Sequence, residues 1–407
     1  MDTDHYPLFR KSKRPTTSAL TILVSLIIVV GCKSVIDRQD VRPRILRDVP
    51  ARNLAYRLSP DVSPPGSYFD DPSDKFGAVA NDFAAKREND ALLRTVVSPD
   101  GRRVLALYGT ADEPGSAFRI DLYNSDGQFL RNLIPPDISC VFPETVIWSP
   151  DGNFITFIAH KRVMPTPSPT PLNELEPDPT ALPEASPSIA PLFPPVASFN
   201  TEQIYICNRD GYDLKPLTSR EGLIYFYFVW APDAHAMAAL ACREDEWNAR
   251  EREYKLPAGR PRLIAPDGTE RLLDDGLTEA LPVWSPDASK VATAFDSDVA
   301  IYDAGGKTPT QGRLPLGDQL IAASVVYEQK TATKKTVTNV NANSAATPTP
   351  AAPAAPPSFN PIVRLEWRAP ETLYFQTAFV RLMPNETINT FQRWHVLNLS
   401  AQAAILK

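Results

Sequence analysis

The stretch Val146-Ile147-Trp148-Ser149-Pro150-Asp151-Gly152 decides the fold that this sequence predicts, together with the apolar run that follows it. Pro150 presets φ at the second position of a type I turn, Asp151 can accept hydrogen bonds from nearby amides, and Gly152 releases the chain into the next strand. Residues 154–158 then have the composition of a buried strand. The stretch therefore predicts two antiparallel strands joined by a tight turn.

This strand–turn–strand unit recurs along the chain, and a repeated unit of this kind indicates a repeat architecture. Each of the four clear copies has a Pro-Asp turn near its start and an Asp-Gly or Gly-Gly hairpin turn near its end. The copies are about 50 residues long once two insertions are set aside. The four clear turns contain Asp100, Asp151, Asp233 and Asp287, and tryptophan precedes three of them, at Trp148, Trp230 and Trp284.

The copies resemble the TolB-type β-propeller repeat, a WD-like repeat whose hallmark is a (V/I)-W-S-P-D-G element. The second copy matches this element closely, the fourth nearly so and the third more weakly, while the first lacks the tryptophan. The resemblance covers residues 91–399. It implies an all-β fold, a β-propeller of four-stranded antiparallel blades around a central channel.

Five blades are visible in the sequence, and we expect six. The fifth copy is faint, with Glu371 where the others have aspartate. The sixth blade would come from residues 41–90 or from the β-prone run 320–328.

The segments outside the repeats differ from them in composition. Residues 163–197 and 331–357 are rich in proline or small polar residues, so we expect disordered insertions between strands. The propeller is expected within 91–407, preceded by a tether and irregular segment, 32–90, that can contribute part of a blade. The charged run 244–255 fits either a short helix or a solvated loop.

Residues 1–31 have the features of a lipoprotein signal peptide. A basic segment precedes an uncharged apolar run, 19–31, that is too short to span a bilayer. The run ends Val29-Val30-Gly31-Cys32, which resembles the bacterial lipobox and implies lipidation of Cys32; an uncleaved signal anchor is the alternative. Lys33 favours the outer over the inner membrane, so we expect a lipid-anchored protein of the bacterial cell envelope, on the periplasmic side.

The charge of the chain restricts its partners. The net charge is −6, and no dense basic tract lies beyond the N-terminus. Phosphate binding needs a clustered positive surface, so nucleic acid is excluded as a partner. An acidic chain is also not drawn to anionic lipid, and attachment to the membrane is expected through the lipid anchor only.

The sequence lacks the common catalytic and metal-binding motifs. The sequence contains no Gly-x-Ser-x-Gly, no His-Glu-x-x-His and no Cys-x-x-Cys. His160, His235 and His395 fall in separate blades, which favours isolated histidines over a channel cluster. We expect no catalytic residue, no metal and no cofactor. Paired carboxylates across blades, as in glycosidases, cannot be recognised in a sequence.

Three cysteines remain after Cys32. Cys207 and Cys242 lie in adjacent blades, and export would permit a disulfide between them. Both, like Cys140, sit in apolar strands, where a free thiol packs as a small hydrophobe. Free thiols are favoured, with the disulfide left open.

The motif residues are interpreted as fold residues: the tryptophans as plates between blades, the aspartates as turn formers. The function expected on this basis is a non-catalytic interaction module, not an enzyme, that binds another envelope protein. The alternative is a periplasmic ligand- or glycan-binding protein, or a hydrolase, that uses channel-lining carboxylates.

Overall fold

The computed structural model describes a single compact unit of the chain, which lies within Arg44–Gln402. The predicted signal peptide, Cys32 and the segments 163–195 and 339–359 lie outside the described residues. The described residues are 46, 49–66, 75–87, 89–110, 117–162, 196–306, 309–338, 360–383 and 386–400.

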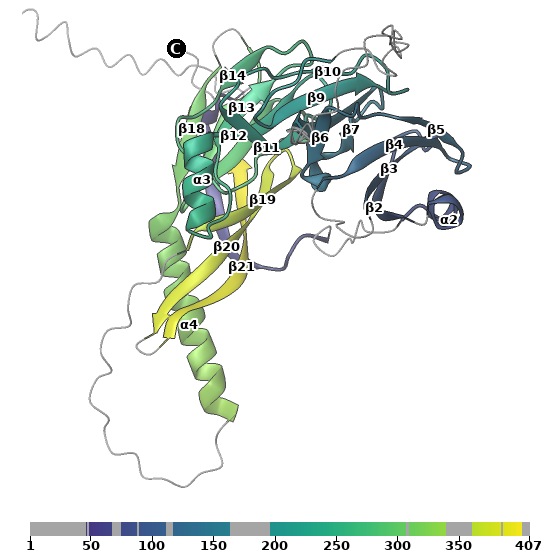
Figure 1. Cartoon of the computed structure of the whole chain (residues 1–407). Helices are drawn as coiled ribbons and strands as arrows, with labels where there is room; N and C mark the ends of the chain where they lie inside the picture. The colour runs from purple at the N-terminus through teal and green to yellow at the C-terminus, as the bar shows by residue number, and fades with distance from the viewer. Residues whose placement is uncertain are drawn as a thin grey trace, which may run out of the picture. The chain divides into compact units, whose positions relative to one another are not determined.

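Five antiparallel sheets form a β-propeller of four-stranded blades, as predicted (Figure 1). Blade 1 contains β2 (Asp90–Val97), β3 (Arg103–Thr110), β4 (Arg119–Asn124) and β5 (Phe129–Asn132). Blade 3 contains β11 (Leu223–Trp230), β12 (Met237–Arg243), β13 (Arg260–Ile264) and β14 (Glu270–Leu272). Blade 4 contains β15 (Val283–Trp284), β16 (Lys290–Phe295), β17 (Asp298–Asp303) and β18 (Gln311–Pro315).

Blade 2 has a divided first strand. Both β6 and β7 pair with β8, and the 3-10 turn η4 (Pro143–Thr145) separates them. The strands of this blade are β6 (Ile138–Val141), β7 (Ile147–Trp148), β8 (Phe154–Lys161), β9 (Gln203–Asn208) and β10 (Lys215–Pro216).

Blade 5 is completed by a strand from the N-terminal part of the chain. Its own strands are β19 (Ile362–Ala369), β20 (Thr372–Met383) and β21 (Glu386–Ser400), and the fourth is β1 (Ala55–Val62), which pairs with β21. Arg393 of β21 holds Asp61 of β1 by two hydrogen bonds of 2.6 and 2.8 Å. Strand β1 lies within the segment 32–90, which was expected to contribute part of a blade.

The expected sixth blade is absent from the described residues. Strand β1 belongs to blade 5, and the run 320–328 lies in helix α4 (Gly317–Thr338). Leu320, Ala323 and Ser324 are its buried positions, and their i, i+3, i+4 spacing is helical. The run therefore buries one stripe of a helix, although its β-prone composition suggested a strand.

Helices flank the sheets. The charged run 244–255 contains α3 (Glu244–Arg252), so the helical alternative is correct. Helix α2 (Gly77–Lys86) packs Val79 and Phe83 against one face of blade 1. The 3-10 turn η2 (Ala51–Asn53) precedes β1. None of the helices among the described residues combines the length and hydrophobicity that crossing a bilayer requires.

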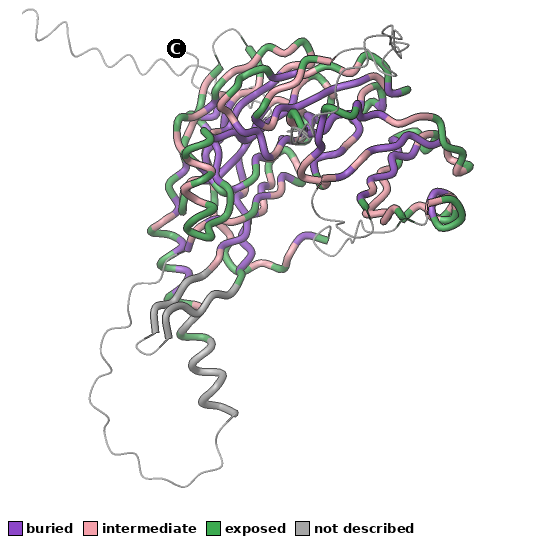
Figure 2. The backbone as a smooth tube through the Cα atoms, viewed as in Figure 1, coloured by how far each residue is buried: buried purple, intermediate pink, exposed green. Residues whose placement is uncertain are grey.

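The core lies between successive blades, where the buried backbone in Figure 2 is concentrated. The second and third strands of a blade are buried on both faces, as in β3, where Leu105 packs toward blade 2 and Val104 toward α2. Further clusters join blade 2 to 3, 3 to 4 and 4 to 5. This double burial explains why these strands are continuous apolar runs in the sequence.

The two ends of the blades differ. Because the strands are antiparallel, the Pro-Asp turns and the late hairpin turns share one end, which we call the turn face. The connections between second and third strands, and between blades, share the other end, the loop face. Helices α3 and α4 both lie in connections at the loop face.

A candidate ligand-binding site on the loop face

A pocket of about 520 Å³ opens on the loop face where blades 3, 4 and 5 meet. Its floor is apolar, formed by the buried residues Ala280, Ala294 and Ile362. The buried hydroxyl of Thr278 donates to the carbonyl of Ala294, which satisfies a polar group at the floor. The pocket therefore combines an apolar floor with charged lining residues, Arg250, Glu279, Asp296 and Arg313.

Arg250 of α3 forms one side of the pocket. Its Nε donates to the carbonyl of Leu256 over 2.6 Å, and its guanidinium pairs with Glu279 in the connection to blade 4. Leu256 and Leu277 line the same rim and are 67% and 37% exposed. This side thus offers both a charged pair and apolar surface to a ligand.

Arg313 of β18 also lines the pocket. Its guanidinium lies 4.4 Å from the ring centroid of Phe295 and 2.9 Å from Asp274. Asp274 also accepts from the Tyr302 hydroxyl over 3.0 Å and from the Gly276 amide over 2.8 Å. Burial, with the Asp274 charge, raises the pKa of Tyr302. The Arg313 head group is therefore held in a fixed orientation.

Helix α3 is anchored to blade 3 by an ion pair and by aromatic contacts. Glu246 accepts two hydrogen bonds of 2.7 Å from Arg260, and these bonds lower the pKa of Glu246 to about 2. Trp247 packs against Phe142 and Phe226, with ring centroids 5.8 and 5.6 Å away. The acidic start of α3 thus takes part in holding the helix on blade 3.

The motif aspartates lie on the turn face, away from this pocket. In three turns a serine hydroxyl donates to the aspartate two residues later, over 2.6 to 2.7 Å. In all four turns the amide two residues after the aspartate also donates to it, over 3.1 Å. The aspartates are Asp100, Asp151, Asp233 and Asp287.

The motif tryptophans connect neighbouring blades. Trp148 Nε1 donates to the carbonyl of Val96 over 3.1 Å, and Trp284 Nε1 to the carbonyl of Val229 over 3.1 Å. Trp230 Nε1 donates to Thr156 Oγ1 over 2.9 Å. Each bond reaches the preceding blade, so these rings lie at the contact between blades.

The histidines do not converge. His160 lies 3.5 Å from Glu202, and His235 is on the turn face. His395 is buried in blade 5, where its Nε2 lies 3.0 Å from Thr377 Oγ1 and burial lowers its pKa to about 4. Within the described ranges, no group of three or more His, Cys, Asp or Glu side chains could hold a metal ion.

The cysteines among the described residues are free and buried. Burial raises the pKa of Cys140, and it raises the pKa of Cys207 and Cys242 to about 12. The interpretation as packed thiols is therefore correct for Cys207 and Cys242, and neither thiol is activated as a nucleophile.

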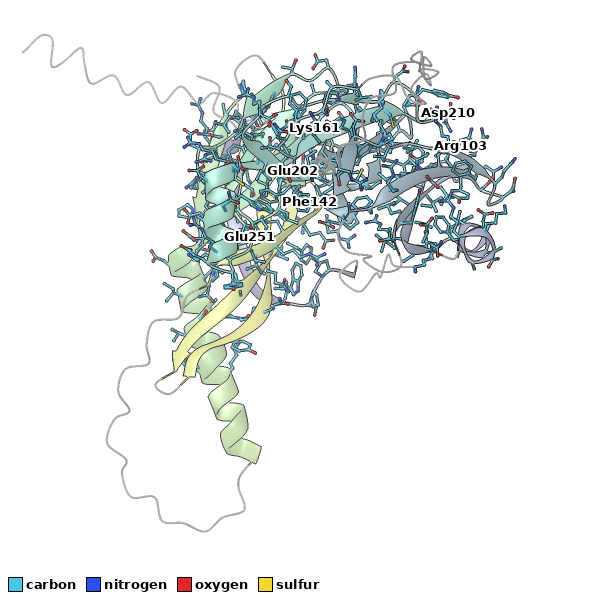
Figure 3. All side chains as sticks on the ribbon, viewed as in Figure 1. Arg103, Phe142, Lys161, Glu202, Asp210 and Glu251 are labelled. Carbon is cyan, nitrogen blue, oxygen red and sulfur yellow. The ribbon has the colours of Figure 1, made fainter. Side chains whose placement is uncertain are left out.

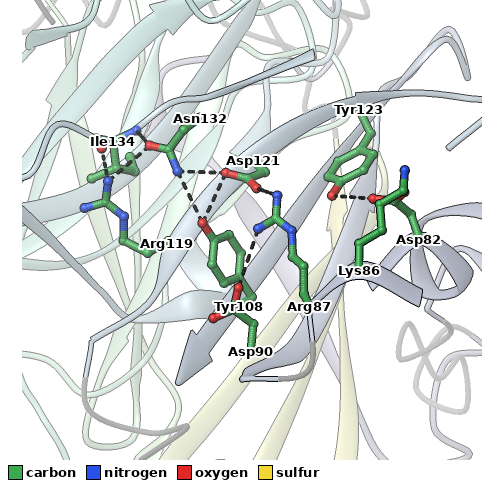
Figure 4. Close-up of polar contacts among 10 residues, drawn as sticks. All are labelled: Asp82, Lys86, Arg87, Asp90, Tyr108, Arg119, Asp121, Tyr123, Asn132 and Ile134. Carbon is green, nitrogen blue, oxygen red and sulfur yellow. Dashed lines mark hydrogen bonds and ion pairs between the residues drawn. The ribbon is translucent and has the colours of Figure 1, made fainter. Parts of the chain in front are cut away.

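A buried polar network joins α2 to blade 1 (Figure 4). Asp121 of β4 is 1% exposed and accepts hydrogen bonds from Arg87, Asn132 and Tyr108, over 2.5, 2.7 and 3.3 Å. Burial raises the pKa of Asp121. Because both carboxylate oxygens accept hydrogen bonds from side chains of the protein, the network fastens the helix to the blade.

Comparisons with known proteins find similarity to solved structures only. No family model and no curated protein matches the sequence. Prolyl oligopeptidase B from Galerina marginata is similar over 85% of this chain and 44% of that chain, at 11% identity and a TM-score of 0.40. An oligogalacturonate lyase in complex with manganese is similar over 75% of this chain and 64% of that chain, at 10% identity and a TM-score of 0.34. A chain of a nidogen/laminin complex is similar over 75% of this chain and 83% of that chain, at 11% identity and a TM-score of 0.31.

The prediction that the chain is not an enzyme is corrected by these likenesses. It rested on the absence of recognised catalytic motifs, yet a lyase and an oligopeptidase are among the structures that the chain resembles. The chain spans less than two thirds of the length of either. Missing motifs therefore do not establish a non-catalytic role.

The residues of the loop-face pocket were missed by sequence reasoning. Arg250 falls within the charged run 244–255, which is the one signal that could have pointed to it. Glu279, Asp296 and Arg313 have no local signature, because the pocket forms only when three blades are brought together.

Proposed function

We propose that this chain is a ligand-binding β-propeller whose site is the loop-face pocket, and that its ligand is a glycan or a molecule of similar size and polarity. The observation that carries the proposal is the pocket itself, an apolar floor surrounded by Arg250, Glu279, Asp296 and Arg313. Its volume of about 520 Å³ falls within the roughly 300 to 1,000 Å³ of small-molecule sites. Apolar surface can pack against sugar rings while the charged rim binds hydroxyl or carboxylate groups.

Calorimetric titration of the mature chain with a panel of neutral and acidic oligosaccharides tests this proposal. At least one should bind, and Leu277→Glu at the rim should weaken that binding about tenfold, equivalent to about 1.4 kcal/mol. Leu272→Glu is the matched control, because Leu272 is 42% exposed and lies outside the pocket. Failure of the whole panel, or equal affinity in the two variants, would contradict the proposal.

Hydrolysis of the bound ligand is a second candidate, because two carboxylates line the same pocket. Glu279 and Asp296 would act as the acid and base of a glycosidase-type reaction. Product release from the panel would support it, with loss of turnover but retained binding in Asp296→Asn. Binding without turnover by the wild-type chain would leave the binding role alone.

We also propose that the protein is an exported, lipid-anchored TolB-like propeller of the bacterial envelope. The signal-like segment 1–31 and the lipobox-like ending at Cys32 support this. Mass spectrometry of the membrane fraction should find a diacylated Cys32 at the mature N-terminus, and Cys32→Ala should abolish it. Retention of residues 1–31 would exclude it.

A further inference from the structure

Neighbouring blades meet on the turn face in a series of equivalent crevices. The crevice between blades 1 and 2 is occupied by charged side chains. Between blades 1 and 2, Arg103 lies 3.2 Å from Asp210, and both are labelled in Figure 3. In a second pair the blades exchange roles: Arg209 of blade 2 lies 2.6 Å from Asp100 of blade 1. Two crossing ion pairs thus close this crevice.

The same four positions can be identified between blades 3 and 4. The strand register places the third residue after the turn aspartate opposite the first residue of the late turn, as in the pairs Phe154–Asn208 and Lys290–Asp303. Counting from these positions, Asp233 corresponds to Asp100, Ala236 to Arg103, Ala304 to Arg209 and Gly305 to Asp210.

Three of the four charged side chains are therefore missing, and a cavity of about 430 Å³ takes their place. Ala236, Ala304 and Gly305 line it, with the buried side chains of Trp284 and Leu263. Between blades 2 and 3 the position of Ala236 is occupied by Phe154, which stacks on Trp230 at 6.4 Å. The cavity thus results from a small residue where other crevices have a large one.

Asp233 remains in this cavity without the partners of its counterpart. The serine that donates to the other motif aspartates is replaced by Ala231, and the arginine of the next blade is replaced by Ala304. Among the described residues, its carboxylate accepts the His235 amide over 3.1 Å and lies 3.6 Å from His235 Nδ1. Its side chain is 50% exposed.

The remaining charge in the cavity is already engaged. Arg271 donates through Nη2 to the carbonyls of Asp303 over 2.6 Å and Ala304 over 3.1 Å. It is thus directed at backbone of blade 4, which leaves the carboxylate of Asp233 as the anionic group facing the opening.

We propose that this crevice binds a guanidinium group, that of an arginine in an extended segment of a partner, which pairs with Asp233 as Arg209 pairs with Asp100. The aliphatic stem of the arginine lies along Trp284 and the alanines, where it buries apolar surface. Guanidinium fits better than ammonium because its planar fork can form two parallel hydrogen bonds with a carboxylate. The site lies on the opposite end of the blades from the loop-face pocket and is independent of it.

Titration of the mature chain with acetyl-Gly-Arg-Gly-amide, followed by Trp284-dependent fluorescence and by calorimetry, tests the proposal. Binding is expected, at least fivefold tighter than for the lysine and glutamine peptides. Asp233→Asn, which preserves the turn hydrogen bond, should weaken it about tenfold. Asp287→Asn, at the equivalent aspartate of blade 4, is the control and should bind as the wild type does.

Ala304→Arg gives a second test, because it inserts the arginine that the first crevice possesses. The added side chain should pair with Asp233, abolish peptide binding and leave the fold intact, as judged by an unchanged or raised Tm. Agmatine distinguishes a free small guanidinium from a peptide: equal binding of agmatine would place the recognition in the guanidinium alone and still support the site. Unchanged peptide binding in both Asp233→Asn and Ala304→Arg, or equal affinity for the glutamine peptide, would overturn the proposal.

Discussion

The turn face and the loop face of this propeller are built from the same strands and follow opposite rules. On the turn face, the serine–aspartate hydrogen bond recurs in blades 1, 2 and 4, and the tryptophan–carbonyl bond in blades 2 and 4. On the loop face, each blade has a different connection, and α3, α4 and the pocket belong to single places in the ring. The difference indicates that repeated residues stabilise the blades, while unrepeated ones shape the cavities.

Replacement of a turn-face tryptophan is expected to cause the largest loss of stability. Trp148→Ala should lower the free energy of unfolding by about 3 to 5 kcal/mol, because it empties a buried site between two blades. Trp148→Phe, which removes the bond to Val96 but keeps most of the ring, should cost about 1 to 2 kcal/mol. Denaturant unfolding followed by circular dichroism measures both.

Trp247→Ala on α3 is the loop-face counterpart, since Trp247 is half-buried against Phe142 and Phe226. It should cost less than Trp148→Ala. An equal or larger cost would mean that the loop face contributes to stability as the turn face does.

Acid should destabilise the protein through His395 in blade 5. Its pKa is about 4 in the folded state, below the ordinary value of 6.5, because the ring is buried. The unfolded chain therefore binds the proton first, and stability present above pH 6.5 is lost as the pH falls toward 4, by up to about 3 kcal/mol. Unfolding midpoints measured between pH 7 and 4 should fall more steeply for the wild type than for His395→Gln.

In the same pH series, the unfolding midpoint of a turn-face variant such as Asp233→Asn should fall as steeply as that of the wild type, because its His395 is intact. Identical slopes for the wild type and His395→Gln would show that burial of this histidine has no part in the acid response.

Substitutions at the residue after the turn aspartate, where the backbone is left-handed, should change stability less. The direction depends on whether glycine is removed or introduced. Gly101 and Ala234 occupy this position with φ of 69° and 59°. Gly101→Ala should cost about 1 kcal/mol, since a Cβ is disfavoured at this φ although the space is open. Ala234→Gly should stabilise by about 0.5 to 1 kcal/mol. Thermal unfolding of the two variants should shift the Tm in opposite directions, and shifts of the same sign would contradict this account.

The smallest effect on stability is expected at the rim of the loop-face pocket. Arg250→Gln removes an ion pair with Glu279 that lies at the surface, and such pairs contribute about 0 to 1 kcal/mol. The Tm should therefore change little, whereas affinity for a bound oligosaccharide should fall. A large loss of stability without loss of binding would assign Arg250 to the fold.

Much of the architecture could be predicted because its signals are local. The turns at Asp100, Asp151 and Asp287 depend on residues within five positions of each other, so their motif is visible in sequence. The sequence left open whether the segment 32–90 contributes part of a blade, because the partner of β1, β21, lies more than 300 residues away. The run 320–328 was predicted as a possible strand and lies in helix α4, because its tertiary contacts, and not its composition, select the helix.

By itself, the sequence determined the repeated unit, the all-β class and the blades, since turn chemistry and strand periodicity act over a few residues. Only the tertiary structure decided the number of sheets, the closure of blade 5 by β1 and the two cavities. The loop-face pocket combines residues from three blades, and the turn-face crevice results from small residues, Ala236 and Ala304, that face each other across two blades. Such sites depend on distances between segments far apart in the chain, and those distances are set when the blades pack.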